Sequence, residues 1–307
     1  MLLALAPCAA LLADAPLSPE APQPNAERLI AWHPIGGSSP RAENRHVGWR
    51  IPQQGWNRYV RLHVQPQLRL GVRRVLIHNP FGHEPITEPM AFDQYAEAQE
   101  AGLTGLTDGF TEAWKPVVDG AYTNGEAVEV ICYLGSIDID RDFVKMRAGE
   151  PTGWSARWVQ RVFTSIEPAL SSGMSFGFDS SSDLPADSAE FKLIELIDAL
   201  GHRCYVESRP LADKPHLWRF NVISTHRHWF RSDPDKHEGA DHNARNRDLK
   251  GEIVVLLNRV KDPRERFDEV ERLWHETSHT VATRLDGEGS AVRLRRWLQP
   301  PPAPHDH

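Results

Sequence analysis

The sequence predicts an α/β fold, a parallel (β/α)8 barrel of the TIM type with one irregular β/α unit. Short apolar, β-branched or aromatic runs alternate with helical patterns from about residue 28 to about residue 260, which is the order of a β/α repeat. The runs are apolar throughout, as in parallel strands covered on both faces. Seven or eight such units in about 270 residues fit a closed barrel better than an open sheet.

Each expected strand stops at a residue that favours a turn or at a polar side chain. The connection between the fifth and sixth strands is too short for a full helix, so that unit is the irregular one. In chain order we expect strands at 28–32, 73–77, 127–134, 174–178, 203–206, 219–224 and 252–257, with a weak eighth at 291–294.

The segments between the strands carry apolar residues at helical spacing. Trp158, Val162, Ile166 and Leu170 are four residues apart and mark one helical face. Gly201 follows another such pattern at the position of a helix C-cap. The expected helices are 56–70, 92–106, 110–118, 155–170, 188–200 and 262–284.

Composition narrows the class of protein. The chain has 307 residues, a net charge of −7 and no long basic run, so nucleic acid is not an expected partner. No glycine-rich GxGxxG or Walker-type loop follows a strand, so we expect no nucleotide cofactor, and no other cofactor is indicated. Oligomeric state is left open.

The ends of the chain differ in composition from the expected barrel at 28–299. Residues 1–27 combine an apolar leader with a Pro-rich linker, and 300–307 form a Pro/His tail expected to be disordered. The leader is too short for stable membrane insertion. If residues 1–16 act as a signal segment the protein is exported, and otherwise a cytoplasmic location is expected.

Polar residues at the C-terminal ends of strands carry the chemistry of such barrels. Several polar side chains follow strands that are otherwise apolar. We expect seven of them to line a substrate-binding cleft: His33, His78, Asn79, Asp138, Arg209, His226 and Asn258.

Asp179 and Glu207 are the expected catalytic pair. They close consecutive strands, and neighbouring strands lie about 4.8 Å apart. Their carboxylates can therefore face each other across roughly 5–6 Å, the separation of a nucleophile and an acid/base in a retaining glycosidase. The competing interpretation is a loop-capping Asp179 and a Glu207 that pairs with Arg209.

The segments Gly177-Phe178-Asp179 and Val206-Glu207 resemble the fourth and fifth strand ends of glycoside-hydrolase barrels, loosely those of the α-amylase type. The resemblance implies a nucleophilic Asp179 and an acid/base Glu207. Two positions depart from that pattern: Gly177 replaces an arginine, and Leu257-Asn258 stands where a His-Asp pair is expected. The resemblance thus implies a glycosidase-like barrel without membership of that family.

Carbohydrate is the expected partner, because indole rings stack on sugar faces and the chain has 10 Trp. The alternative is a non-catalytic structural or carbohydrate-binding barrel in a larger assembly, such as an envelope or virion component. A further interpretation starts from His33 and His78, whose positions resemble those of the two catalytic histidines in phosphodiesterase barrels. Glu84 and Glu88 would then supply the acidic metal ligands.

A third functional class is a zinc hydrolase. His275-Glu276-Thr277-Ser278-His279 matches HExxH, in which two histidines on one helical face bind zinc and the glutamate is the base. The apolar stripe of the expected helix points His275 and His279 toward solvent, so we expect no metal at this motif.

Overall fold

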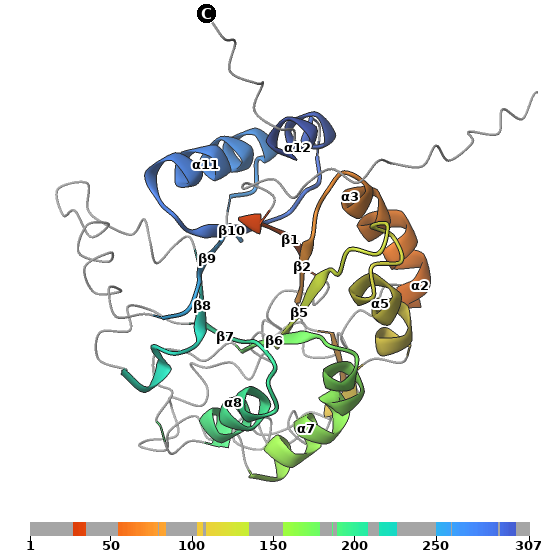
Figure 1. Cartoon of the computed structure of the whole chain (residues 1–307), viewed down its shortest axis with the longest axis vertical. Coiled ribbons are helices and arrows are strands. Elements are labelled where there is room, and N and C mark those ends of the chain that lie inside the picture. The colour runs from red at the N-terminus through yellow and green to blue at the C-terminus, as the bar shows by residue number, and fades with distance from the viewer. Residues whose placement is uncertain are drawn as a thin grey trace, which may run out of the picture.

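A computed structural model shows a closed parallel barrel of eight strands, with helices packed around it (Figure 1). The barrel brings the first and last strands of the chain side by side, because β1 pairs with β10. The structure describes residues 27–34, 55–78, 80–83, 103–106, 109–134, 156–178, 186, 189–207, 215–225, 250–258, 260–287 and 289–298.

The strands follow the chain around the barrel in order. Every neighbouring pair is parallel, as the apolar runs predict. The barrel strands are β1 (Leu29–Pro34), β2 (Arg74–His78), β5 (Glu129–Leu134), β6 (Ser175–Phe178), β7 (Cys204–Glu207), β8 (Asn221–Thr225), β9 (Ile253–Leu256) and β10 (Thr280–Thr283).

Helices cover the outside of the barrel. Between β7 and β8 the described residues contain only the 3-10 turn η4 (Pro215–Leu217). The others are α2 (Gly55–Tyr59), the π-helical turn η2 (Val60–Val64), α3 (Gln65–Arg69), α5 (Phe110–Val118), α7 (Ala156–Ser171), α8 (Ala189–Ala199), α11 (Pro263–Glu276) and α12 (Ser290–Leu298).

Strand side chains alternate between the barrel lumen and the layer beneath the helices. The outer layer forms the larger buried cluster, to which helices and strands both contribute. The second buried cluster fills the lumen with Ile30, Trp32, Leu76, Ile131, Tyr133, Tyr205, Ile223, Val254, Leu256 and Ala282. Whether a side chain at the end of a strand faces the lumen or the layer beneath the helices determines which groups it can contact.

The expected eighth strand at 291–294 is wrong, because these residues lie within α12. The eighth strand is β10, inside the segment that we expected to be the end of the last helix. That helix, α11, starts at the cap Asp262 and stops at Glu276, where Thr277 takes an extended conformation. The β-branched residues that follow favour a strand. The helix was expected to continue through them because Val281 lies at the spacing of its apolar residues.

The expected helix at 92–106 is also wrong at its end. Residues Leu103–Leu106 form β4, which pairs antiparallel with β3 (Phe81–His83) outside the barrel. The expected leader and linker before residue 27 and the tail after 298 lie outside the described residues. Among the described helices, none is long and apolar enough to cross a membrane.

Candidate functional site

The C-terminal mouth of the lumen holds a carboxylate beside aromatic rings. Glu207 is the last residue of β7 and lies two positions after the lumen residue Tyr205, so its side chain is on the lumen side of the strand. The hydroxyl of Tyr133, from β5, donates a hydrogen bond to Oε2 of Glu207. Two strands that are not neighbours thus share this contact across the mouth.

Gly177 makes this contact possible. It lies on β6 between the two strands, and a Cβ built there would meet Tyr133 Cδ2 at 2.8 Å and Ile223 Cδ1 at 3.2 Å. The ring of Tyr133 therefore occupies the space that any larger residue at 177 would need. An arginine at this position would displace Tyr133.

His78 and Trp32 continue the wall of the mouth. The His78 ring lies 4.9 Å from the Tyr133 ring, centroid to centroid, and 6.2 Å from the Trp32 ring. His78 ends β2 two residues after the lumen residue Leu76, which places it on the lumen side. The mouth thus combines a carboxylate with flat rings.

Tyr133 was not predicted as a site residue, and Gly177 was noted only as a departure from the α-amylase pattern. Tyr133 lies inside an apolar strand and carries no motif. A signal was present in the strand alternation, because Tyr133 is two residues from Ile131 on the lumen side.

Of the other expected site residues, the structure describes some and not others. Asn258 is exposed just after β9, and its backbone N–H donates to the Leu256 carbonyl at 3.0 Å. In the β6–β7 register Phe178 pairs with Val206, the residues that precede Asp179 and Glu207 in the chain. Five expected residues lie outside the described residues: Asn79, Asp138, Asp179, Arg209 and His226.

His33 does not join the mouth. It follows the lumen residue Trp32 on β1 and therefore faces the outer layer, where it is buried. Its Nδ1 bonds the Tyr59 hydroxyl at 2.9 Å and its Nε2 bonds Gln67 Oε1 at 3.0 Å. Burial lowers the pKa of His33 to about 4, so the ring is neutral near pH 7.

The opposite, N-terminal end of the lumen is closed by charges that the sequence analysis missed. Arg74 begins β2, and its Nε donates to Glu129 Oε2 at 2.8 Å. Its two terminal nitrogens donate to Glu252 at 2.6 and 2.7 Å and to the Tyr205 hydroxyl at 2.9 Å. Tyr205 in turn donates to Glu129 at 2.7 Å.

These contacts keep Arg74 and Glu252 charged and Tyr205 protonated. Burial alone lowers the pKa of Arg74, but the Glu252 hydrogen bond and the Glu129 charge raise it above its usual value. Burial alone raises the pKa of Glu252, but Arg74 holds it below its usual range. Burial and the Glu129 charge raise the pKa of Tyr205. Charged groups that pair with one another at the N-terminal end of such a barrel typically stabilise the fold rather than take part in chemistry.

The HExxH segment does not have the geometry that the motif requires. Helix α11 ends at Glu276, so His275 and His279 are not on one helical face. Glu276 is exposed and pairs with Arg272, while His279 is buried just before β10, against the expected solvent position. Among the described residues, no group of three histidines, cysteines or acids could hold a metal ion.

Comparisons with known proteins add little to this geometry. No protein-family model matches the chain, and no curated protein matches it in sequence. One similar solved structure, described as a structural study from Aquifex aeolicus VF5, is 12% identical and has a TM-score of 0.44. That match covers 89% of this chain and 93% of the other, and we rest no argument on it. The barrel is shown by its own strand pairing, and the resemblance to glycoside hydrolases gains no support here.

Proposed function

We propose that the mouth of the barrel binds a carbohydrate and hydrolyses a glycosidic bond, with Glu207 as the proton-transferring carboxylate. The observation that carries the proposal is the Tyr133–Glu207 hydrogen bond at the C-terminal end of the lumen. Catalytic groups of this fold occupy that end. A positioned carboxylate is the group that glycoside hydrolysis requires.

The rings around Glu207 support a sugar as the substrate class. Tyr133, His78 and Trp32 form a nearly continuous aromatic wall beside the carboxylate. Flat rings bury large areas at low conformational cost, and the apolar faces of pyranose rings provide a matching surface. The Tyr133 hydroxyl orients the carboxylate by bonding one of its two oxygens.

In the proposed reaction Glu207 gives its proton to the glycosidic oxygen as the bond to the anomeric carbon breaks. A water molecule then supplies the hydroxyl for that carbon and gives its remaining proton to the Glu207 carboxylate, which restores the acid. Asp179 is the proposed second carboxylate, on the ground that it follows Phe178, whose partner Val206 precedes Glu207. It would act as nucleophile or stabilise the positive charge of the transition state.

The test is hydrolysis of a panel of aryl glycosides that differ in sugar and in anomeric configuration. We expect Glu207→Gln to lower turnover about 10²–10⁴-fold, because the amide keeps the acceptor oxygen for Tyr133 but has no proton to transfer. Substrates with dinitrophenyl leaving groups need little protonation, so they should lose much less.

Asp179→Asn serves as the matched variant, and it should lose turnover on activated and unactivated substrates alike. If the parent protein hydrolyses no glycoside of the panel, the proposal is wrong. Saturable sugar binding without hydrolysis would instead favour the non-catalytic, carbohydrate-binding barrel.

A further inference from the structure

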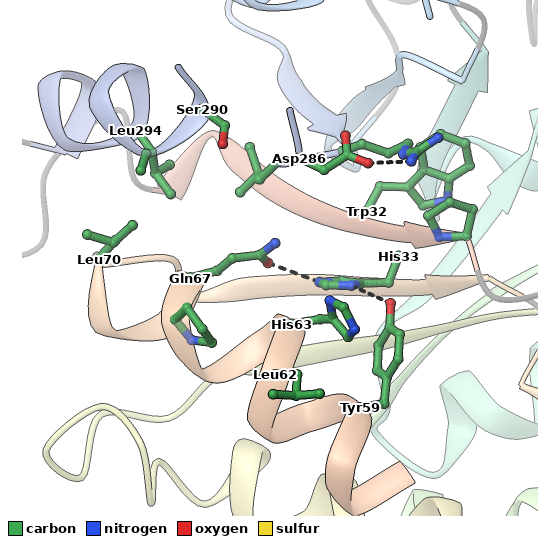
Figure 2. A pocket seen from close by; sticks show the side chains of 15 residues that line it. Trp32, His33, Tyr59, Leu62, His63, Gln67, Leu70, Asp286, Ser290 and Leu294 are labelled. Atoms are coloured by element: carbon green, nitrogen blue, oxygen red, sulfur yellow. Dashed lines mark hydrogen bonds and ion pairs between the residues drawn. The ribbon is translucent and has the colours of Figure 1, made fainter. Parts of the chain in front are cut away.

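A pocket lies outside the lumen, near the place where the first and last strands of the barrel, β1 and β10, pair. It is a groove of about 450 Å³ between the helical run α2–η2–α3 and α12, with the end of β1 as its floor (Figure 2). This volume lies within the range of about 300–1,000 Å³ typical of small-molecule sites. The proposed glycosidase reaction makes no use of it.

The hydrogen bonds of His33 determine which donor groups of the groove wall remain for a ligand. Gln67 Oε1 can only accept, so His33 Nε2 carries the proton and donates to it. Nδ1 then accepts from the Tyr59 hydroxyl. Gln67 is left with its amide N–H groups, which have no partner among the described residues and point away from His33 toward the space beneath α12 (Figure 2).

A π-helical turn makes this arrangement possible. Tyr59 and Gln67 are eight residues apart, which in a regular α-helix leaves their side chains about 80° apart around the axis. The turn Val60–Val64, with Gln65 N–H bonded to the Val60 carbonyl, inserts one extra residue. With this insertion, the side chains of Tyr59 and Gln67 lie about as far apart around the helix axis as residues seven positions apart in a regular α-helix, which is about 20°. Both side chains therefore reach His33. Such turns are frequent at functional sites.

One end of the groove carries a net positive charge. Asp286 is shared by two guanidinium groups: the buried Arg266 donates to it at 2.7 Å, and Arg284 donates to its other oxygen. Two positive charges therefore face one negative charge. Arg284 is about half exposed and lines the groove, so it can offer its remaining N–H groups to a ligand.

The other end is apolar. Leu70 and Leu294 lie together on the side of the groove away from Asp286 and Trp32 (Figure 2). Leu62, on the π-helical turn, is 45% exposed and adds apolar surface at the rim. The groove is thus amphipathic along its length.

We propose that this groove binds a small monocarboxylic acid with an aliphatic or aromatic body. The carboxylate pairs with Arg284 and accepts from the Gln67 amide, and the body lies against Leu70 and Leu294. A monoanion matches the single excess positive charge, whereas a dianion would also face Asp286. The Tyr59 hydroxyl keeps its proton, because it donates to His33 and burial raises its pKa to about 12.

The test is binding of 4-phenylbutyrate to the full chain near neutral pH, followed by ligand-observed NMR and calorimetry. We expect saturable binding, at least about tenfold tighter than that of the uncharged 4-phenylbutyramide, as one charge-assisted hydrogen bond implies. Acetate, which has the head group but no body, should also bind at least about tenfold more weakly.

Arg284→Gln should lower the affinity for 4-phenylbutyrate to that for the amide, because the guanidinium is lost while Asp286 keeps Arg266. Lys192→Gln removes a positive charge from α8, across the barrel (Figure 1), and should leave the affinity unchanged. The melting temperature of both variants checks that they fold. The proposal fails if the acid and its amide bind equally, if neither binds at millimolar concentration, or if Arg284→Gln binds like the parent.

Discussion

The two ends of the barrel lumen hold carboxylates that accept hydrogen bonds from different kinds of donor. At the N-terminal end, Glu129 and Glu252 bond a buried guanidinium, Arg74, at 2.6–2.8 Å. At the C-terminal mouth, Glu207 accepts a hydrogen bond from the hydroxyl of Tyr133. A guanidinium neutralises the charge of the carboxylate that it pairs with, whereas a hydrogen bond from a hydroxyl orients a carboxylate without adding a positive charge. Together with the proposed function, the comparison leads to one account: the N-terminal end of the lumen serves stability and the C-terminal mouth serves chemistry.

The largest effect should come from breaking the N-terminal end. Arg74→Met is expected to lower the free energy of unfolding by about 3–5 kcal/mol, because it removes the buried cation and leaves two largely buried carboxylates with the exposed Arg203, at 3.3 Å from each, as their remaining cation among the described residues. Urea unfolding followed by circular dichroism measures the loss. Arg219→Gln, which breaks an exposed pair with Glu195, is the control and should cost less than about 1 kcal/mol. Equal small losses in both variants would show that the network does not stabilise the barrel.

The second prediction is a pH dependence of the free energy of unfolding that arises in the outer layer of the barrel, where His33 is buried. Burial, with a smaller contribution from His63, lowers the pKa of His33 to about 4 from 6.5, despite the opposing effects of Gln67 and Asp286. The unfolded chain therefore takes up this proton first. Stability from His33 is complete above pH 6.5, falls as the pH drops toward 4, and is lost below it. The total is about 3 kcal/mol.

Urea unfolding of the parent and of His33→Gln across this pH range measures that contribution. The parent should lose about 3 kcal/mol more than the variant between pH 7 and pH 4. Histidine NMR provides the direct check, and a His33 ring that titrates near its ordinary pKa would contradict the burial argument.

The smallest effect on stability should come from the mouth. Gly177→Ala is expected to cost about 1–3 kcal/mol, since the new Cβ overlaps the Tyr133 ring and the strands must shift. The same change in a Tyr133→Val background should cost less, because valine lacks the atom that the Cβ would meet. A double-mutant cycle measures the difference. If the two costs are equal, Gly177 does not make room for Tyr133.

Much of the barrel could be predicted from the sequence, because apolar strands and turn residues are local signals. Seven strands were predicted with small shifts at their ends. The eighth failed because Val281 continues the apolar spacing of the preceding helix. The sequence could not show that the chain leaves the helix at Thr277.

The site was harder to predict, because both faces of a parallel strand are apolar and the sequence does not say which face is the lumen. His33 and His78 both end early strands, and we expected both in one cleft. The structure places His78 beside Tyr133 and His33 beneath α3, because they lie on opposite faces of their strands. Tyr133 and Arg74 were missed for the same reason, since only the closed barrel shows what each one meets across the lumen.

One measurement tests the division between the two ends most directly: turnover and unfolding free energy of Glu207→Gln and Glu252→Gln, compared on a glycoside that the parent hydrolyses. The variants make the same chemical change at opposite ends of one lumen. We predict that Glu207→Gln loses about 10²–10⁴-fold in turnover with little loss of stability, and that Glu252→Gln loses stability but keeps parental turnover while folded. The reverse pattern, or equal loss of turnover in both, would contradict the account.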